Sequence, residues 1–549
     1  MFNFSVTPMG NLFFGLTVTI FLSLAVIRFL SFGAKASDSE KNSLFLCLLL
    51  FTALGVIFYA NDLITLFIGW EVMSWSSYFI LANRAKIKTL QKYIIFNLGA
   101  GFALLGAIVL IYSFTGTMLY EQIDFSKVPT MLHLPISILL LITIFVKSGV
   151  MPFHHWVVDS YEESDNLFSA VLSAIISKAG IFLFILMFTQ IIGYKLLEPT
   201  LFDVVAWLGV ITSVVATFKA ISQDSMKRLL AYSSIAQLGY IVTILSIFSA
   251  SGVEAGLYHT IIHTFVKLLL FVNIASIIYI TGKSKFSELG GLIYRYPLLF
   301  VMLLIGIIGL AGMPPLAGFN SKFLIYTTLL EEKKALLLVA IMFSSASAFL
   351  YCFKLIYGIY LGQVVDDKTE HKELPDSYYV PQIIGSIVLI VLGFFPSFGT
   401  MIINSTLTTL GFELTIYKSL TELNAGFASF NGAMIITIFA LIFIAILLIS
   451  LSLKNRLRER RDRYDISYCG ETPNPSVNLH YGYGIGEELR RISFIGVILK
   501  NSSQASWERL ATITKDSSIL LKQLYSLTVQ NVGVLTLLLF TILLFVGVK

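Results

Sequence analysis

The feature that most constrains this chain is a series of long apolar stretches, which recur along nearly all of its 549 residues. Of these residues 56% are hydrophobic and only 13% are charged, about half of the charged share of a soluble domain. Most stretches approach or exceed the roughly 20 residues with which an α-helix crosses a ~30 Å hydrocarbon core. The sequence therefore predicts an all-α, polytopic membrane protein, and it excludes a soluble enzyme, a nucleic-acid-binding protein and a disordered scaffold.

Hydropathy predicts about fourteen transmembrane spans, at 10–31, 43–60, 62–82, 92–115, 133–163, 166–192, 203–220, 227–248, 255–280, 297–332, 335–362, 379–399, 430–454 and 531–548. They group into an N-terminal helix (1–42), two halves (43–192 and 203–362), two accessory helices (379–454), an extension (455–530) and a last span (531–549). The first span has no basic leader and no small-residue cleavage site, so we expect it to be retained.

Two of these spans, 133–163 and 297–332, are too long for one straight helix and contain prolines, Pro152 in the first and Pro314–Pro315 in the second. Proline removes a backbone donor and clashes with the preceding turn, so we expect both helices to be broken. Each would be the fourth member of a block of five spans, and an odd number per block requires the second block to be inverted. Interrupted spans at matching positions of two inverted repeats are typical of a transporter's ion path.

Loop charge predicts the orientation. Loops on one side carry most of the basic residues, whereas those on the other side carry only Lys127, Lys195, Lys333, Lys334 and Lys418. By the positive-inside rule the basic side is cytoplasmic, so both termini are expected on the outer side of the cell membrane. The extension 455–530, which opens with five arginines within 456–463, is then expected in the cytoplasm.

Six spans carry ionisable residues deep in an apolar run, each costing roughly 2.5–3.5 kcal/mol at the centre of a membrane helix. They are Glu71, Lys147, Lys178, the trio His259, His263 and Lys267, Lys322 and Lys354. Intramembrane charges of this kind favour a role in ion movement over chance retention.

Glu71 and Lys147 are expected to form a pair, since Lys147 directly precedes the first break. At ~4 Å and an effective dielectric constant of ~20 such a pair is worth about 4 kcal/mol, enough to control when the lysine releases its proton. The alternative is a structural ion pair that joins two helices.

His259, His263 and Lys267 follow an i, i+4, i+8 spacing and share one helical face. This pattern favours a proton relay, with histidines that merely join neighbouring helices as the alternative. A zinc site is disfavoured, because the HExxH glutamate and a further nearby ligand are missing. Lys322 follows the second break, while Lys354 could instead extend to the cytoplasmic interface.

No motif for soluble chemistry is present: there is no Walker motif, and Cys47, Cys352 and Cys469 lie far apart without a CxxC pair. We therefore expect no metal, cofactor or redox centre in this chain.

Five motifs resemble those of one family: WEVMS at 70–74, KSGVMPFHHW at 147–156, QDSMKRLLAYSS at 223–234, HTIIHTFVK at 259–267 and GMPPLAGFNSK at 312–322. Together, over about residues 10–400, they resemble the antiporter-like, proton-pumping membrane subunits of respiratory complex I and their Mrp antiporter relatives. A shorter match at 468–471 and beyond resembles the antiporter-like subunit of energy-converting membrane hydrogenases, including formate hydrogenlyase.

The resemblance implies two inverted half-channels joined by a polar axis. It makes Glu71 and Lys147 the first pair, Lys178 the connecting lysine, His259 to Lys267 the central relay and Lys322 the terminal lysine. His154 and Asp159, in and after the family's PFHxW motif, are further candidates, as is Lys354. The family's APSPVSA stretch reads SDNLFSA at 164–170, without either proline.

These features predict an ion-translocating subunit, most simply for protons, of a redox-driven membrane complex of the hydrogenase or sulfane reductase type. Electron transfer would take place in partner subunits, a peripheral arm with Fe–S and NiFe centres. The alternatives are a component of a stand-alone Na⁺/H⁺ antiporter, a complex I pumping subunit proper, and a structural spacer whose charges only pair helices.

Overall fold

The computed structural model describes residues 2–32, 38–361, 372–412, 419–426, 428–458, 507–509, 512 and 515–516. The chain divides into two units, Met1–Leu499 and Lys500–Lys549, and every helix and strand named below belongs to the first. The predicted last span at 531–549 and most of the extension at 455–530, including Cys469, lie outside the described residues.

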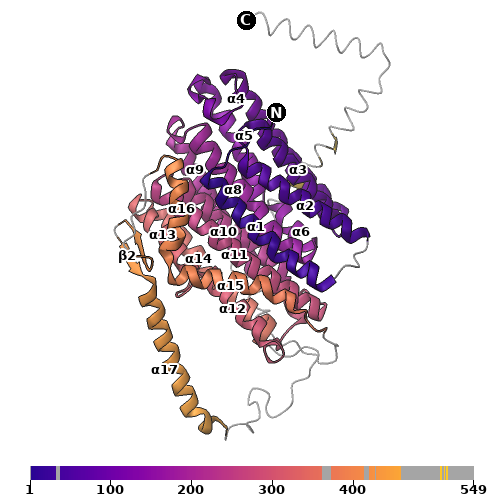
Figure 1. Cartoon of the computed structure of the whole chain (residues 1–549), viewed down its shortest axis with the longest axis vertical. Coiled ribbons are helices and arrows are strands. Elements are labelled where there is room, and N and C mark those ends of the chain that lie inside the picture. The colour runs from indigo at the N-terminus through magenta and orange to yellow at the C-terminus, as the bar shows by residue number, and fades with distance from the viewer. Residues whose placement is uncertain are drawn as a thin grey trace, which may run out of the picture. The chain divides into compact units, whose positions relative to one another are not determined.

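Helices dominate the described part of the chain (Figure 1). The α-helices are α1 (Pro8–Phe32), α2 (Asp38–Tyr59), α3 (Leu63–Ala82), α4 (Ile87–Thr115), α5 (Thr130–Ser148), α6 (His155–Glu163), α7 (Asn166–Val171), α8 (Ser177–Ile185), α9 (Pro199–Ile221), α10 (Met226–Leu245), α11 (Ala250–Thr281), α12 (Pro297–Ala311), α13 (Ala317–Glu331), α14 (Ala335–Ile356), α15 (Tyr379–Phe394), α16 (Pro396–Thr409) and α17 (Gly432–Arg458). π-Helical turns are η3 (Leu172–Ile176), η4 (Leu186–Ile191) and η8 (Tyr357–Leu361). Short 3₁₀ turns are η1 (Tyr120–Gln122), η2 (Phe125–Lys127), η5 (Tyr194–Leu196), η6 (Phe286–Glu288), η7 (Leu292–Tyr294) and η9 (Asp376–Tyr378).

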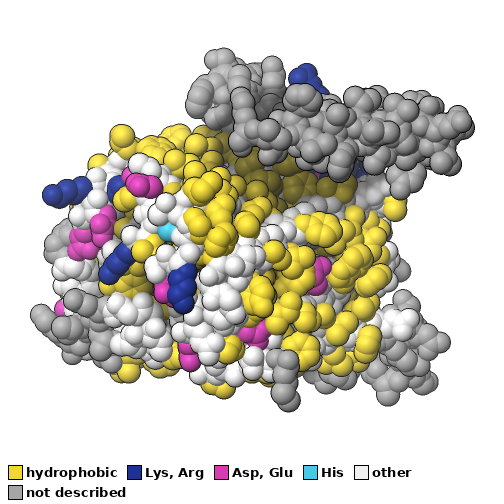
Figure 2. Space-filling view, turned by 90° about the horizontal axis from the view of Figure 1, so that it is seen from above, with side chains coloured by type: hydrophobic (Ala, Val, Ile, Leu, Met, Phe, Trp, Pro, Cys, Tyr) yellow, Lys and Arg dark blue, Asp and Glu magenta, His cyan; other side chains and the backbone are white. Residues whose placement is uncertain are grey.

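The prediction of a multi-pass, mostly helical membrane protein is confirmed. Eleven stretches of the described residues are long and apolar enough to cross a membrane. Apolar side chains cover much of the face seen in Figure 2, as a surface in contact with lipid requires. One hairpin departs from the all-helical prediction: β1 (Glu422–Ala425) pairs antiparallel with β2 (Ala428–Asn431).

Both long spans are broken, as the sequence predicts. The first ends at Ser148, where Gly149 takes a left-handed conformation (φ 68°), and α6 begins at His155. The second ends at Ala311, followed by left-handed Gly312 (φ 72°), and α13 begins at Ala317. Left-handed glycine ends a helix without the steric cost that a Cβ would add.

The predicted span 379–399 is wrong at its end, because the helix stops at Phe394 and a second helix, α16, begins at Pro396. A residue before proline is pushed out of the helical region, and Phe395 accordingly has φ −120° and ψ 70°. Pro396 then occupies the first turn of α16, where its missing N–H costs nothing.

The centre of the first unit is formed by the stretch Asn166–Ile191 and by α10 and α11, whose residues are almost all buried. Around α11 pack α7, α10, α12, α13, α15 and α16. Helix α11 thus lies among these helices (Figure 1). The central histidines and Lys267, which it carries, are buried.

Candidate functional site

Lys147 lies in the last turn of α5, directly before the first break, and its side chain is buried. Its ammonium donates to Asn97 Oδ1 on α4 (2.7 Å) and to Ser74 Oγ on α3 (3.1 Å). The same nitrogen lies 5.2 Å from the centre of the Trp70 ring, a cation–π distance. Two helices, α3 and α4, therefore hold the cation that α5 presents.

The predicted direct pair between Glu71 and Lys147 is not formed: no ion pair between them occurs among the described residues. Glu71 is half-buried, and its carboxylate fills the space left by Gly101, where a Cβ would lie 2.1 Å from Oε1. Asn97 and Gly101 are one turn apart on α4, so the two groups occupy neighbouring turns. The Lys147 ammonium therefore meets Asn97, where the sequence predicted the Glu71 carboxylate.

Lys178 and His263 are brought into contact by the structure. The Lys178 ammonium lies 2.8 Å from His263 Nδ1 and donates to the carbonyl of Ser173 (2.5 Å). Ser173 belongs to the π-helical turn η3, a local distortion often found at functional sites. The contact supports the predicted connection between the lysine on α8 and the central helix α11.

His259 and Lys267, one turn to either side of His263, point to different neighbours. His259 Nδ1 lies 3.0 Å from Ser321 Oγ on α13, and its Nε2 lies 2.9 Å from Gln237 Oε1 on α10. Lys267 instead donates to Ser233 Oγ (2.6 Å) and to the Leu230 carbonyl (3.2 Å). Of these two residues, His259 rather than Lys267 therefore forms a hydrogen bond with the second broken helix.

Lys322 lies in the first turns of α13, and it reaches back across the break. Its ammonium donates to the Ala311 carbonyl at the end of α12 (2.7 Å) and to Ser345 Oγ on α14 (2.7 Å). Lys354 is buried and donates to the carbonyl of Ile221, the last residue of α9 (3.2 Å). Its role, in ion movement or at the cytoplasmic interface, stays a prediction.

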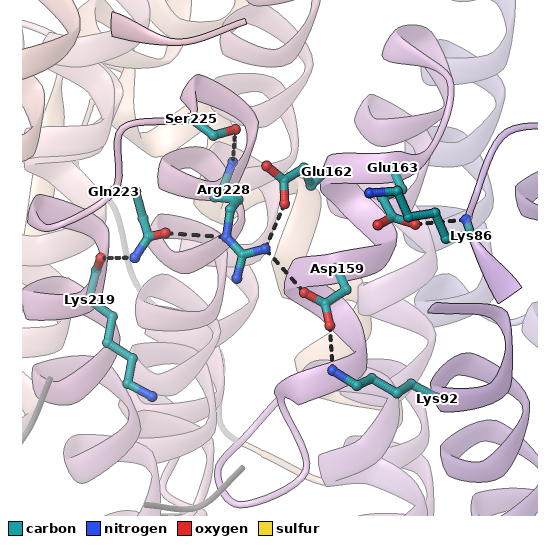
Figure 3. A network of polar contacts seen from close by, with 9 residues as sticks. All are labelled: Lys86, Lys92, Asp159, Glu162, Glu163, Lys219, Gln223, Ser225 and Arg228. Carbon is teal, nitrogen blue, oxygen red and sulfur yellow. Dashed lines mark hydrogen bonds and ion pairs between the residues drawn. The ribbon is translucent and has the colours of Figure 1, made fainter. Parts of the chain in front are cut away.

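Asp159 on α6 belongs to a network that joins α4, α6 and α10 (Figure 3). Its carboxylate pairs with Lys92 (2.7 Å) and Arg228 (3.1 Å), and Arg228 also pairs with Glu162 (2.6 Å). Gln223 accepts from Arg228 Nε (3.2 Å) and donates to the Lys219 carbonyl.

His154, which the resemblance also made a candidate, is buried, and its ring centre lies 4.1 Å from that of His155.

The hydroxyl and amide groups that hold the buried cations and histidines are not among the site residues expected from the sequence. These are Ser74, Asn97, Ser233, Gln237, Ser321 and Ser345. A signal was available, because Asn97 and Gln237 are strongly polar residues inside apolar spans, and such residues usually face a functional interior. Ser74 also lies about one turn after Glu71 on the same helix.

Among the described residues, no group of three or more His, Cys, Asp or Glu side chains could hold a metal ion. The absence of a metal or cofactor from the whole chain stays a prediction. What the bundle does contain is a line of buried lysines and histidines between two broken helices, the class of arrangement that membrane proteins use for ion pathways.

Comparison with known proteins agrees with this class. Residues 60–348 match the family model described as "NADH:quinone oxidoreductase/Mrp antiporter, TM". The chain belongs to this family, and it is an antiporter-like membrane protein related to complex I and the Mrp antiporters.

Individual relatives are similar over most of this chain. It is 31% identical over 433 residues to the A component of the Na(+)/H(+) antiporter of Alkalihalophilus pseudofirmus, covering 72% of this chain and 53% of that protein. It is 28% identical to the F(420)H(2) dehydrogenase subunit N of Methanosarcina mazei, covering 69% of this chain and 80% of the relative. The chain thus spans only about half the length of the first of these relatives.

One solved structure is similar over nearly the whole chain. It is that of the membrane-bound sulfane sulfur reductase, an archaeal respiratory membrane complex, with a TM-score of 0.86 and 26% identity over 98% of this chain and 89% of the other. The resemblance stated from the sequence motifs is therefore confirmed.

Proposed function

We propose that this chain moves ions, most simply protons, across the cell membrane as the antiporter-like subunit of a redox-driven complex related to complex I. One observation carries the proposal. Within the described residues, no carboxylate lies within 4 Å of the buried ammonium groups of Lys147, Lys178, Lys267 and Lys322.

A purely structural role predicts the opposite arrangement. A buried charge that only joins helices is stabilised by an opposite charge, because an unpaired ion loses its hydration without compensation. These lysines instead meet hydroxyls, an amide, a histidine and backbone carbonyls, which accept hydrogen bonds from an ammonium and also from a neutral amine. Such a site is suited to a lysine that gains and loses a proton.

The polar contacts supply part of a pathway. Lys178 touches His263, and His259 touches Ser321, the residue next to Lys322. We place Lys147 with Glu71 at the start of this line and Lys322 at its outer end. The two broken helices, α5–α6 and α12–α13, would be equivalent members of two inverted five-helix repeats at 43–192 and 203–362.

The partners follow from the same proposal. Further membrane subunits and a hydrophilic arm with Fe–S and NiFe centres would carry out electron transfer, and this chain would couple it to ion movement. The similarity to the sulfane sulfur reductase complex over 98% of the chain supports this assignment. The basic loops would face the cytoplasm and both termini the outside.

A second function is favoured by one comparison. The 31% identity to a component of a Na(+)/H(+) antiporter supports an exchanger component that works without redox partners. The two functions differ in what drives them, since an exchanger moves protons across a vesicle membrane when a sodium gradient alone is imposed.

The test is proton and sodium uptake into inverted vesicles that contain the intact complex, comparing wild type with Lys147→Ala. Lys334→Ala is the control, because Lys334 forms an exposed pair with Asp203. We expect Lys147→Ala to lower uptake at least tenfold with assembly and electron transfer retained, and Lys334→Ala to leave uptake unchanged. Normal uptake in an assembled Lys147→Ala complex would contradict the proposal.

A further inference from the structure

Lys178 is held by a backbone carbonyl that a local distortion of its helix makes available. In an α-helix the N–H of Ser177 would bond to the carbonyl of Ser173, four residues earlier. In the π-helical turn η3 this N–H bonds to the Leu172 carbonyl instead. The Ser173 carbonyl accepts from the Lys178 ammonium (2.5 Å) and from the Ser177 hydroxyl (2.9 Å). These two donors replace the helical one, as a buried carbonyl requires.

The side chain of Ser173 makes a second contact, with a distant part of the chain. Its Oγ lies 2.8 Å from Oγ of Ser234 on α10, and both residues are fully buried. Turn η3 lies in the first of the two proposed repeats and α10 in the second. One pair of hydroxyls therefore joins the two repeats at the residue whose carbonyl holds Lys178.

Ser234 and its neighbour Ser233 serve two different lysines. Ser233 Oγ accepts directly from the Lys267 ammonium (2.6 Å). Ser234 reaches Lys178 indirectly, through Ser173. Both serines end the motif QDSMKRLLAYSS, to which the sequence assigned no residue of the ion path.

The π-helical turn is also supported from a second side. The Tyr161 hydroxyl on α6 donates to the Leu172 carbonyl at the start of η3 (3.0 Å). π-Helical turns are rare, and they are found frequently at functional sites. Side chains from α6 and α10 thus hold a backbone conformation that presents one carbonyl to the Lys178 ammonium.

We propose that Ser173 and Ser234 are positioning residues for Lys178, and that the hydrogen bond between their hydroxyls holds η3 so that the lysine keeps its contact with His263. The Lys178 ammonium lies 2.8 Å from His263 Nδ1 while it donates to the Ser173 carbonyl. A shift of the turn therefore moves the ammonium relative to the imidazole ring. This inference rests on the proposed function, in which Lys178 and His263 belong to the ion path.

The alternative is a hydroxyl that merely joins two helices, and Thr243 on the same helix α10 is an example. Its hydroxyl donates to the carbonyl of Ala206 on α9 (3.1 Å), and the residue is as deeply buried as Ser234. Its partner belongs to an α-helix rather than to a π-helical turn. Thr243→Val, which removes this hydroxyl, is therefore the matched control.

The first experiment measures proton uptake into inverted vesicles at equal amounts of assembled complex. We expect Ser234→Ala to lower uptake at least fivefold and Thr243→Val to change it less than twofold. Equal effects of the two variants, or uptake within twofold of wild type in Ser234→Ala, would overturn the proposal.

The second experiment removes the same hydrogen bond from its other side. Ser173→Ala is expected to lower uptake as much as Ser234→Ala, and the double variant is expected to lose no more than either single one. Two residues that act only through their mutual contact show such non-additive effects. Losses that multiply in the double variant would mean that the two hydroxyls act independently, and the proposal would be wrong.

The third experiment observes the contact between Lys178 and His263 itself. In purified complex labelled with ¹⁵N-histidine, the His263 signals are assigned by their loss in His263→Gln. We expect the Nδ1 signal to shift in Ser234→Ala and to stay in place in Thr243→Val. A contribution to helix packing alone would lower the amount of assembled complex without moving this signal, so an unchanged signal in Ser234→Ala would contradict the proposal.

These outcomes separate the inference from the proposed function. If Lys147→Ala leaves uptake intact, the proposed function fails, whereas the His263 signal still shows whether the two serines position Lys178. If Lys147→Ala abolishes uptake while Ser234→Ala does not change it, the chain moves ions but the pair of serines has no part in that movement.

Discussion

The two broken helices differ in how the buried lysine beside each break is hydrogen-bonded. At the first break the lysine, Lys147, precedes the gap and is held entirely by side chains, those of Asn97 and Ser74 on other helices. At the second break Lys322 follows the gap and takes one of its acceptors from the break itself, the Ala311 carbonyl. The first site thus depends on neighbouring helices, while the second depends on the interrupted backbone.

Two glycines near these sites differ in what surrounds them. In the second break a Cβ on Gly318 would lie 1.8 Å from the Gly309 carbonyl oxygen, so α12 and α13 meet backbone to backbone. In the first half a Cβ on Gly101 would meet only the end of the Glu71 side chain. A flexible side chain can move away, whereas a helix backbone cannot do so without shifting the whole element.

The largest effect is expected for Gly318→Ala. The added methyl group must separate α12 from α13, and overpacking of this kind costs about 1–3 kcal/mol or more. We expect a clear loss of thermal stability and of assembled complex. Gly106→Ala is the control, since its Cβ would sit at an ordinary 3.6 Å from the nearest atom. Equal stability of the two variants would show that the second break is not backbone-packed.

The second largest effect, a loss of ion uptake, is expected when Lys147 or Lys322 loses a hydrogen-bond acceptor. Asn97→Leu removes a 2.7 Å acceptor of Lys147, and Ser345→Ala removes a 2.7 Å acceptor of Lys322. A hydrogen bond to a charged group contributes about 1.5–3 kcal/mol. We expect Asn97→Leu to lower ion uptake about tenfold or more and Ser345→Ala to lower it less, because Lys322 retains the Ala311 carbonyl. Vesicle uptake measures both, and the reverse order would break the comparison.

A smaller effect is expected in the ion-pair network that ties α6, after the first break, to α4 and α10. Asp159 pairs with two cations and Glu162 with one, and all are partly exposed. Surface pairs contribute about 0.2–1 kcal/mol each. Asp159→Asn should therefore destabilise the chain by about 1 kcal/mol and Glu162→Gln by about half of that, both less at high salt. Thermal unfolding at low and high salt measures this, and equal effects would place Arg228, rather than Asp159, at the centre of the network.

The smallest effect is expected for Lys334→Ala. Its pair with Asp203 is short, at 2.6 Å, but both side chains are well exposed. We expect a change in thermal stability below about 0.5 kcal/mol and no change in ion uptake. A change in uptake would indicate that charge outside the buried line contributes to transport.

Much of the site could be predicted because burial of charge in a membrane is expensive. The apolar runs located the spans, and the ionisable residues inside them located Lys147, Lys178, Lys322 and the histidines of α11, all of which are buried. Helical spacing correctly grouped His259, His263 and Lys267 on one helix. The breaks were readable because Pro152 and Pro314–Pro315 fall deep within long apolar spans, where proline interrupts a helix, whereas Pro135 lies near the start of α5 and leaves it intact.

The partners of these residues could not be predicted. Glu71 and Lys147 were expected to pair because opposite charges attract whatever their separation in the sequence. The Lys147 ammonium instead donates to Asn97. Nor did the helical spacing indicate that the Lys267 ammonium meets Ser233 on α10. The end of α15 was misplaced because hydropathy does not register a proline between two apolar helices.

The sequence alone determined that this chain lies in a membrane, where its helices break, and which side chains carry charge in the apolar interior. These properties depend on local chemistry: hydropathy, backbone conformation and the cost of desolvating an ion. The tertiary structure alone decided which hydroxyl, amide or carbonyl each buried cation meets. That choice is made across helices by small differences in packing, and no spacing along one helix encodes it.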